Sequence, residues 1–363
     1  MKTGNKTDRI LYMAFPQPDY SKSEVKRAGF ALINSKSTKA EREKALTVLT
    51  NWRACHGYPL NTFQATLRTR LKRLNFQKAF VAQRLKRMPT IIKKLERFKT
   101  MKLSTMQDIG GLRAIVSSLD NVSELEGSYL SDRRFPHELV RSDDYIEKPK
   151  DDGYRSIHLV YKYNNKLVPA YNGLQIELQI RTKLQHIWAT AVETMGTYLG
   201  QSLKSGEGET KWRDFFALAS SAFAYIEKTP PVPKYAKLNK VETFKALAHI
   251  ERDIDGLNVM SGFSFALSII PKRSGKSSYY HLIILDTKNK KVDITSYAKK
   301  DIKKASRDYT EAEKDAEVKK VEPVLVSAGD LRSLKTAYPN FFLDVGDFIG
   351  KVTSIIDKSK KMP

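Results

Sequence analysis

The stretch that decides the fold is residues 144–158, DYIEKPKDDGYRSIH. A polar segment ends in Gly153, and a run rich in β-branched and aromatic residues follows from Ser156 to Tyr163. Asp, Pro and Gly are typical of turns, and glycine tolerates the backbone that a tight turn needs. We therefore predict a turn that brings Tyr154 to the entrance of a β-strand, where its ring could stack on a base.

Strands and helices alternate on both sides of this turn. Apolar or β-branched runs predict strands at Leu112–Ser118, Ser156–Tyr163 and Leu174–Ile180. Helical spacing predicts helices at 21–34, 39–56, 90–98, 121–130, 183–199 and 211–227. Such alternation is typical of an α/β domain with a mostly buried mixed sheet that helices flank.

A proline-rich segment, Thr229–Pro233, interrupts this pattern and suggests a boundary. Beyond it we expect a helix at 239–255, strands at Phe263–Ile270, Tyr279–Asp286, Lys291–Tyr297 and Pro323–Ser327, and helices near 329–337 and 344–356. The predicted organisation is a main domain over 1–235, a linker helix over 236–256 and a small α+β domain over 257–363.

The charge of the chain points to polyanionic partners. A net charge of +24 arises from 64 Lys and Arg against 40 Asp and Glu, and such a field attracts nucleic acids or nucleotide phosphates. Thirteen of these cations lie between Gln64 and Lys102, where Glu96 is the single acid. With one cysteine, Cys55, and no long apolar stretch, we expect a cytoplasmic protein that does not enter a membrane.

Two carboxylates stand at predicted strand edges. Asp108 precedes one strand, and Glu177 lies within another. In the second strand Ile176, Leu178 and Ile180 alternate with Glu177, Gln179 and Arg181, which places three polar groups on one face of the sheet. Neighbouring strands lie about 5 Å apart, so two acids placed in this way can bind one Mg²⁺.

The basic stretch supplies cations that a triphosphate would need. The sequence has no glycine-rich phosphate loop followed by Lys-Ser or Lys-Thr, so the cations must come from elsewhere. Pro89 suits the first turn of a helix, whose N-terminal amides favour phosphate. Within that helix Thr90 and Lys94 share one face at a spacing of four residues.

Three segments in this order resemble the synthetase domain of the RelA/SpoT family. They are residues 106–116, MQDIGGLRAIV, residues 144–158, and residues 175–182, QIELQIRT. The resemblance covers about residues 60–230. It implies a nucleotidyltransferase-like mixed sheet and an enzyme that moves pyrophosphate from ATP onto a ribose 3′-hydroxyl.

The resemblance also implies roles for individual residues. Asp108 and Glu177 would hold Mg²⁺, and Glu177 would polarise the attacking hydroxyl. The residues implied in ATP binding are Arg84, Lys86, Thr90, Lys94, Arg113 and His158. Those assigned to the acceptor are Tyr154, Lys148, Lys150, Gln179 and Arg181. Thr90 stands where the family usually has Ser, which keeps the hydroxyl. No histidine cluster precedes this region, so we expect synthesis without the family's manganese hydrolase domain.

A narrower resemblance extends to the C-terminal part. Residues 185–194, QHIWATAVET, residues 200–204, GQSLK, and residues 338–344, YPNFFLD, are similar to toxic small alarmone synthetases of the fused toxin–antitoxin type, the CapRel group. This implies pyrophosphorylation of the CCA end of tRNA, which stops translation. It also implies a C-terminal domain that restrains the enzyme, through Tyr338 and Phe341, until a phage capsid protein binds.

Two other interpretations stay open from the sequence. One is a (p)ppGpp synthetase that uses GDP or GTP, with the C-terminal domain as a regulatory module. The other is an inactive RNA-binding protein, against which the joint presence of Asp108, Glu177, Tyr154 and Arg84 argues. We expect a monomer in either case.

Overall fold

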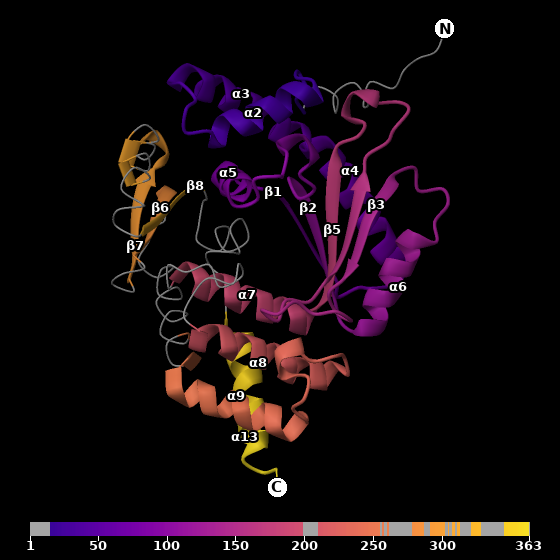
Figure 1. The fold of residues 1–363 in the computed structure, drawn as a ribbon, viewed down its shortest axis with the longest axis vertical. Coiled ribbons are helices and arrows are strands. Elements are labelled where there is room, and N and C mark those ends of the chain that lie inside the picture. Colours follow the sequence, from indigo (N-terminus) through magenta and orange to yellow (C-terminus); the bar gives the residue numbers. More distant parts are fainter. Residues whose placement is uncertain are drawn as a thin grey trace. The chain divides into compact units, whose positions relative to one another are not determined.

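The computed structural model describes residues 15–198, 210–254, 256–257, 260, 278–286, 291–301, 304, 307–308, 311–312, 321–327 and 345–362. The chain divides into two compact units (Figure 1), which are described here one by one. Unit 1 comprises residues 1–145 and 156–183, and unit 2 comprises residues 146–155 and 184–363. These units do not follow the predicted domain boundaries at 235 and 257, which stay a prediction.

Unit 1 is built on a five-stranded mixed sheet in the order β1-β2-β5-β4-β3. The strands are β1 (Phe80–Leu85), β2 (Gly110–Val116), β3 (Glu138–Asp144), β4 (Ile157–Lys162) and β5 (Gln175–Thr182). Strands β2 and β5 run parallel, and the other neighbours are antiparallel. The predicted α/β class with a mixed sheet is confirmed.

The α-helices described in unit 1 are α2 (Lys22–Ile33), α3 (Lys39–Cys55), α4 (Gly57–Arg73), α5 (Met88–Arg97) and α6 (Leu119–Leu130). Capping boxes start the first two, because Ser21 and Thr38 each exchange hydrogen bonds with a glutamate three residues later. Helices α4 and α6 contact each other and the strands β2 and β5. They cover the apolar face of the sheet, where Phe63 of α4 and Tyr129 of α6 both contact the Tyr161 ring of β4.

The strands show why one face of this sheet is left for chemistry. Along β5, Ile176, Leu178 and Ile180 are fully buried, while Glu177 and Gln179 are only partly buried. Successive side chains of a strand point to opposite faces, so the polar pair lies on the face away from α4 and α6. This alternation is the one that the sequence predicted.

Unit 2 holds a helical cluster and a small sheet. Its helices are α7 (Lys183–Tyr198), α8 (Thr210–Glu227), α9 (Lys240–Ile254) and α13 (Gly346–Ser359), although Lys183 itself falls in unit 1. Buried aromatic rings join α7, α8 and α13, and Phe348 of α13 lies 5.8 Å from the ring of Phe216 and 5.8 Å from that of Phe223. The helix near the C-terminus is therefore part of the same core as α8.

The small antiparallel sheet has the order β7-β6-β8, with β6 (Ser278–Asp286), β7 (Lys291–Ala298) and β8 (Val321–Ser327). These match three of the strands predicted for the C-terminal part. The fourth, Phe263–Ile270, and the helix near 329–337 lie outside the described residues, as do Tyr338 and Phe341. Among the helices that the structure describes, none has the length and apolar character needed to span a membrane.

Candidate active site

The polar face of unit 1 brings Glu177 and Gln179 next to β2. Glu177 is opposite Gly111 in the β2–β5 ladder, and Gln179 is opposite Arg113. The amide nitrogen of Gln179 donates to Glu177 Oε2 over 2.8 Å, while its carbonyl oxygen accepts from Arg113 Nε and Nη2 over 3.3 and 3.4 Å. Gln179 thus connects the predicted catalytic carboxylate to a predicted phosphate ligand.

The other oxygen of Glu177 pairs with a histidine. Glu177 Oε1 lies 2.9 Å from His158 Nδ1, and both side chains are largely buried. Burial by itself raises the pKa of Glu177, but the hydrogen bond and charge of His158 outweigh it and hold the pKa below its usual value. The ring of Tyr145 meets His158 edge-on at 5.1 Å and helps to fix its orientation. Tyr145 is a neighbour of the site that sequence reasoning missed.

Asp108 is held by two lysines. The Nζ atoms of Lys86 and Lys94 donate to the same carboxylate oxygen, Oδ2, over 2.9 and 2.7 Å. Burial acts to raise the pKa of Asp108, and the two lysine charges bring it below its usual value. Lys86 directly follows β1, and its N–H donates to Ile109 O over 2.8 Å. Lys94 comes from α5, which opens with a proline as predicted.

The carboxylate pair fits a magnesium ion. Asp108 Oδ1 is buried and has no hydrogen-bond partner in the described part of the chain. Asp108 lies close enough to Glu177 for its charge to act on the pKa of that group. In the described residues no cluster of three or more His, Cys, Asp or Glu could hold a metal alone. Mg²⁺ commonly takes one or two carboxylates and completes its shell with water and substrate phosphates, so Asp108 and Glu177 would suffice.

The other predicted ATP ligands lie on the same elements. Arg84 of β1 is opposite Gly111 in the sheet, in the row that also contains Glu177. Thr90 is exposed in the first turn of α5, and no hydrogen bond within the described residues joins it to Asp108 or the lysines. Arg181, which was predicted on the acceptor side, is almost fully buried at the end of β5. The structure thus brings Asp108, Lys86 and Lys94 together, and separately Glu177, His158, Gln179 and Arg113.

The predicted acceptor tyrosine belongs to unit 2. Gly153 has a φ of +94°, and a Cβ there would meet Ser220 Cβ at 2.8 Å, so only glycine fits. Ser220 Oγ donates to Gly153 O over 2.7 Å and accepts from Arg155 Nε over 3.0 Å. Tyr154 stands between these anchored residues, and the Lys150 ammonium lies 5.2 Å from its ring centre. The predicted turn is confirmed.

Sequence reasoning missed Arg155 and Ser220 as the anchors of this turn. Arg155 is buried, and burial lowers its pKa to about 10. Its Nη1 also donates to Ile146 O over 3.1 Å, which closes the 146–155 segment on itself. Ser220 lies 65 residues away in sequence on α8, so no local pattern points to it. Lys148 of this segment is exposed.

The comparisons with known proteins fall on this region. Residues 83–202 match the family model described as the region found in RelA / SpoT proteins. GTP pyrophosphokinase YjbM of Bacillus subtilis is 34% identical over 113 residues, which are 31% of this chain and 53% of that protein. GTP pyrophosphokinase YwaC of the same organism is 31% identical over 116 residues, which cover 30% of this chain and 52% of that protein. The chain therefore spans about half the length of these relatives.

Solved structures show similar coverage. Small alarmone synthetase 2 from Bacillus subtilis aligns with a TM-score of 0.43 and 22% identity over 49% of this chain and 94% of that one. Small alarmone synthetase 1 from the same organism, bound to its product pppGpp, aligns with a TM-score of 0.42 and 25% identity over 48% of this chain and 90% of that one. Residues 83–202 are thus similar to the region found in RelA / SpoT proteins.

Proposed function

We propose that this protein is a pyrophosphotransferase that moves pyrophosphate from ATP to a ribose 3′-hydroxyl. The observation that carries the proposal is the cluster of Asp108 with Lys86 and Lys94. Asp108 is close enough to Glu177, in the same unit, for its charge to raise the pKa of that carboxyl group. Phosphoryl and pyrophosphoryl transfers depend on positioning and on neutralising charge. Two lysines and two carboxylates for Mg²⁺ supply these requirements, and one of the carboxylates, Glu177, is also the proposed base.

In this proposal the chain's residues divide the work. Glu177 accepts the proton of the attacking hydroxyl, and His158 and Gln179 keep its two oxygens in place. Lys86, Lys94, Arg84, Arg113 and Thr90 bind the phosphates of ATP, and His158 lies beside them. Bound Mg²⁺ would offset charge on the phosphate oxygens. Tyr154 stacks on the acceptor base, with Lys148, Lys150 and Arg181 on the acceptor side.

Two acceptors are candidates. The relatives YjbM and YwaC are named GTP pyrophosphokinases, which makes GDP or GTP the acceptor that the comparisons favour. The CCA end of tRNA is the second candidate, because thirteen cations against one acid between Gln64 and Lys102 exceed what a mononucleotide requires.

With tRNA as acceptor, the protein would act as a toxin that blocks translation in anti-phage defence. Its C-terminal domain, over 257–363, would restrain it through Tyr338 and Phe341, and a phage protein would release it. Expression of a variant with Ala at both positions then inhibits growth without phage, and adding Glu177→Gln restores growth. Normal growth of the stably expressed double variant contradicts restraint by this pair.

One assay tests the proposed chemistry. Incubating the protein with ATP labelled at the γ-phosphate, Mg²⁺ and either GDP, GTP or tRNA should move label to one acceptor, and a chelator should stop the transfer. Label on GDP or GTP alone selects the alarmone synthetase, and label on tRNA selects the toxin. No transfer to any of the three rejects the pyrophosphotransferase.

A further inference from the structure

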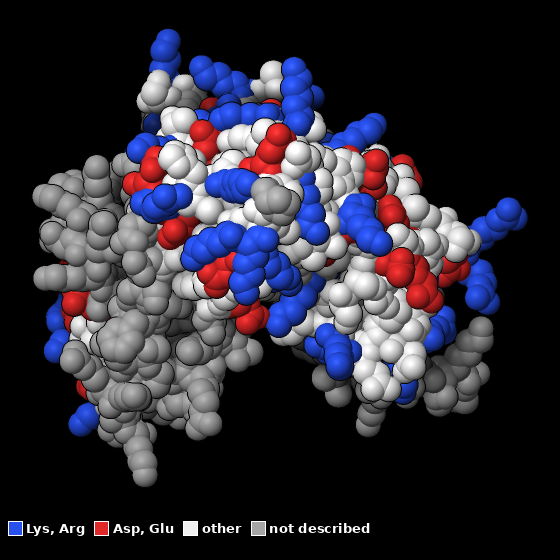
Figure 2. All heavy atoms as spheres, turned by 90° about the horizontal axis from the view of Figure 1, so that it is seen from below, with Lys and Arg blue, Asp and Glu red and all other residues white. Residues whose placement is uncertain are grey.

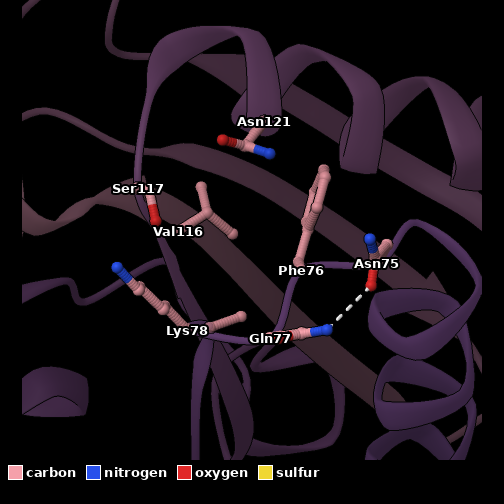
Figure 3. Close-up of a pocket in the computed structure, with 8 residues that line it drawn as sticks. Asn75, Phe76, Gln77, Lys78, Val116, Ser117 and Asn121 are labelled. Atoms are coloured by element: carbon pink, nitrogen blue, oxygen red, sulfur yellow. Dashed lines mark hydrogen bonds between the residues drawn. The ribbon is translucent and has the colours of Figure 1, made fainter.

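A polar pocket lies at the other end of the β1–β2 ladder from Asp108. It has a volume of about 330 Å³ and is formed by the loop after α4, the end of β2 and the start of α6. Its lining comprises Asn75, Phe76, Gln77, Lys78, Ala79, Val116, Ser117 and Asn121. In Figure 3 the Phe76 ring and the Lys78 side chain lie on opposite sides of this pocket.

Backbone hydrogen bonds hold the pocket loop in place. Asn75 adopts a left-handed conformation with φ of 57°. Its N–H donates to Lys72 O over 3.1 Å, and the N–H of Phe76 donates to Leu71 O over 2.9 Å. These bonds fold the loop back on the last turn of α4, as at many helix C-termini. The pocket is therefore formed before any ligand arrives, and Lys72 and Arg73 lie beside its loop.

The lining offers the groups that recognise a nucleobase. Phe76 is half-buried and presents an aromatic ring. Gln77 Nε2 donates to Asn75 Oδ1 over 3.2 Å, and Ser118 Oγ donates to Asn121 Oδ1. In the described part of the chain, the side-chain nitrogens of Asn75 and Asn121 (Nδ2) and the side-chain oxygen of Gln77 (Oε1) have no protein partner. Donors and an acceptor beside a ring suit the edge and face of a base.

Exposed cations occur in the pocket loop and in the part of α4 that leads into it. Arg68, Lys72, Arg73 and Lys78 are all exposed, and the structure gives none of them an ion pair within the residues it describes. On the face drawn in Figure 2, Lys and Arg side chains gather in groups that Asp and Glu interrupt. Residues 64–79 contain no acid at all. Lys72 and Arg73 lie in the last turn of α4, where cations are stabilised by the negative end of the helix dipole. This role does not explain the exposed charge of Lys78 or the presence of the pocket.

The pocket is remote from the predicted phosphate ligands. Strand β1 leads from Ala79, which lines the pocket, to Lys86, which holds Asp108. Seven residues at about 3.3 Å each separate the two ends by about 23 Å. A single nucleotide cannot occupy both places, so the pocket is a second site.

We propose that this pocket binds single-stranded RNA together with the exposed cations Arg68, Lys72, Arg73 and Lys78. One base enters the pocket, stacks on Phe76 and is hydrogen-bonded by Asn75, Gln77 and Asn121. Lys78, Lys72, Arg73 and Arg68 contact the phosphates on either side. The pocket lies apart from the residues proposed to transfer pyrophosphate, while its cations belong to the basic stretch that also supports tRNA as an acceptor.

The test compares two variants of the full-length protein with the same change of charge. One is Lys72→Gln/Arg73→Gln/Lys78→Gln, and the control is Lys36→Gln/Lys44→Gln/Arg27→Gln, which alters exposed cations of α2, α3 and their connection. Fluorescence anisotropy measures binding of a short labelled single-stranded RNA over a range of salt concentrations, without ATP. The pocket variant should lower the slope of log affinity against log salt by about 2, because each phosphate contact contributes about 0.7. The control should leave the slope near that of the wild type.

A second variant isolates the base. Phe76→Ala should weaken RNA binding roughly 5- to 150-fold, the effect of one base–aromatic stack, with the salt slope kept. Thermal melting verifies that each variant is folded.

Equal slopes in the pocket and control variants, or unchanged affinity of the folded Phe76→Ala protein, would overturn the proposal. Displacement of the RNA by an equal concentration of GTP would also overturn it, since the pocket would then accept a free nucleotide. Binding is measured without ATP, so loss of pyrophosphate transfer in a separate assay leaves this result unaffected, and the two proposals fail independently.

Discussion

His158 and Glu177 pair at 2.9 Å although they are not opposite each other in the β4–β5 ladder, where Glu177 faces Val160 and His158 faces Gln179. The contact is diagonal, and the direct neighbour Gln179 binds the second oxygen of the same carboxylate. Glu177 is thus held from two sides by groups on its own sheet. A carboxylate held in this way has little freedom to turn.

Replacing Glu177, the proposed base, should stop pyrophosphate transfer and keep the fold. Glu177→Gln keeps the shape of the side chain but removes the charge that accepts a proton, so we expect pyrophosphate transfer to fall at least about a hundredfold, as is usual for a lost general base. Label transfer and thermal melting measure the two effects. Glu138→Gln, on the exposed edge strand β3, is the matched control. Activity within tenfold of wild type removes Glu177 from the mechanism.

Neighbouring lysines of α5 should differ in their effect on ATP. Lys94 contacts Asp108, whereas Lys93 is exposed on another side of the helix. A charge-assisted hydrogen bond is worth about 1.5–3 kcal/mol, so Lys94→Ala should weaken ATP binding roughly 10- to 150-fold. Lys93→Ala should leave it near the wild-type value. Calorimetric titration with ATP and Mg²⁺ checks this, and equal losses in both variants would indicate only a general effect of charge.

Tyr154 should act on the acceptor alone. Tyr154→Ala removes a stacking ring worth about 1–3 kcal/mol, so we expect a higher KM for the acceptor and an unchanged affinity for ATP. Tyr154→Phe keeps the ring and should remain close to wild type. If ATP affinity falls instead and acceptor dependence does not change, the assignment of the two substrate sides is reversed.

Mild acid should destabilise unit 1 through buried histidines. Burial lowers the pKa of both His56 and His137 to about 4. Below about pH 6.5 these histidines are protonated in the unfolded chain but stay neutral in the folded protein. The free energy of unfolding therefore decreases as pH falls from about 6.5 to about 4. The loss reaches about 3 kcal/mol for His56 and less for the more accessible His137.

Denaturant titrations between these pH values measure that loss. A His56→Gln variant should show a shallower dependence on pH than wild type. The lowered pKa values of Asp108 and Glu177 act in a different window, because their contribution is present above their unfolded values and disappears only as pH falls below about 4.5. A pH dependence that the His56 variant shares fully with wild type contradicts the assignment to this histidine.

The parts of the fold that the sequence predicted share a clear local signal. Strand β5 alternates apolar and polar residues, and α5 carries a proline in its first turn. Strand β3 was missed because it is an edge strand, exposed along its length and rich in charge. Strand β1 was missed because it lies in a basic stretch without strict alternation. Helix α4 was missed because the same charge pattern concealed the spacing of Phe63, Leu67 and Leu71.

The candidate site shows the same limit. Asp108, Lys86, Lys94 and Glu177 could be predicted as site residues because each lies in a short motif. The pairing of both lysines with one oxygen of Asp108, and the bridge that Gln179 forms to Arg113, depend on strand register and helix placement. Ser220 could not be predicted, because it contacts Arg155, which is 65 residues away, and the local spacing of residues does not indicate such a contact.

The shared core of α8 and α13 has a consequence for the order in which parts of the protein fold during translation. Phe348 is fully buried among Phe215, Phe216 and Phe223 of α8, the helix whose Ser220 anchors Gly153. During translation the sheet of unit 1 can form as soon as residue 183 has left the ribosome. The part of the α8 core that α13 supplies is absent until residues 346–359 have emerged. Unit 1, with its predicted phosphate ligands, can thus fold on the ribosome before the aromatic core around α8 is complete.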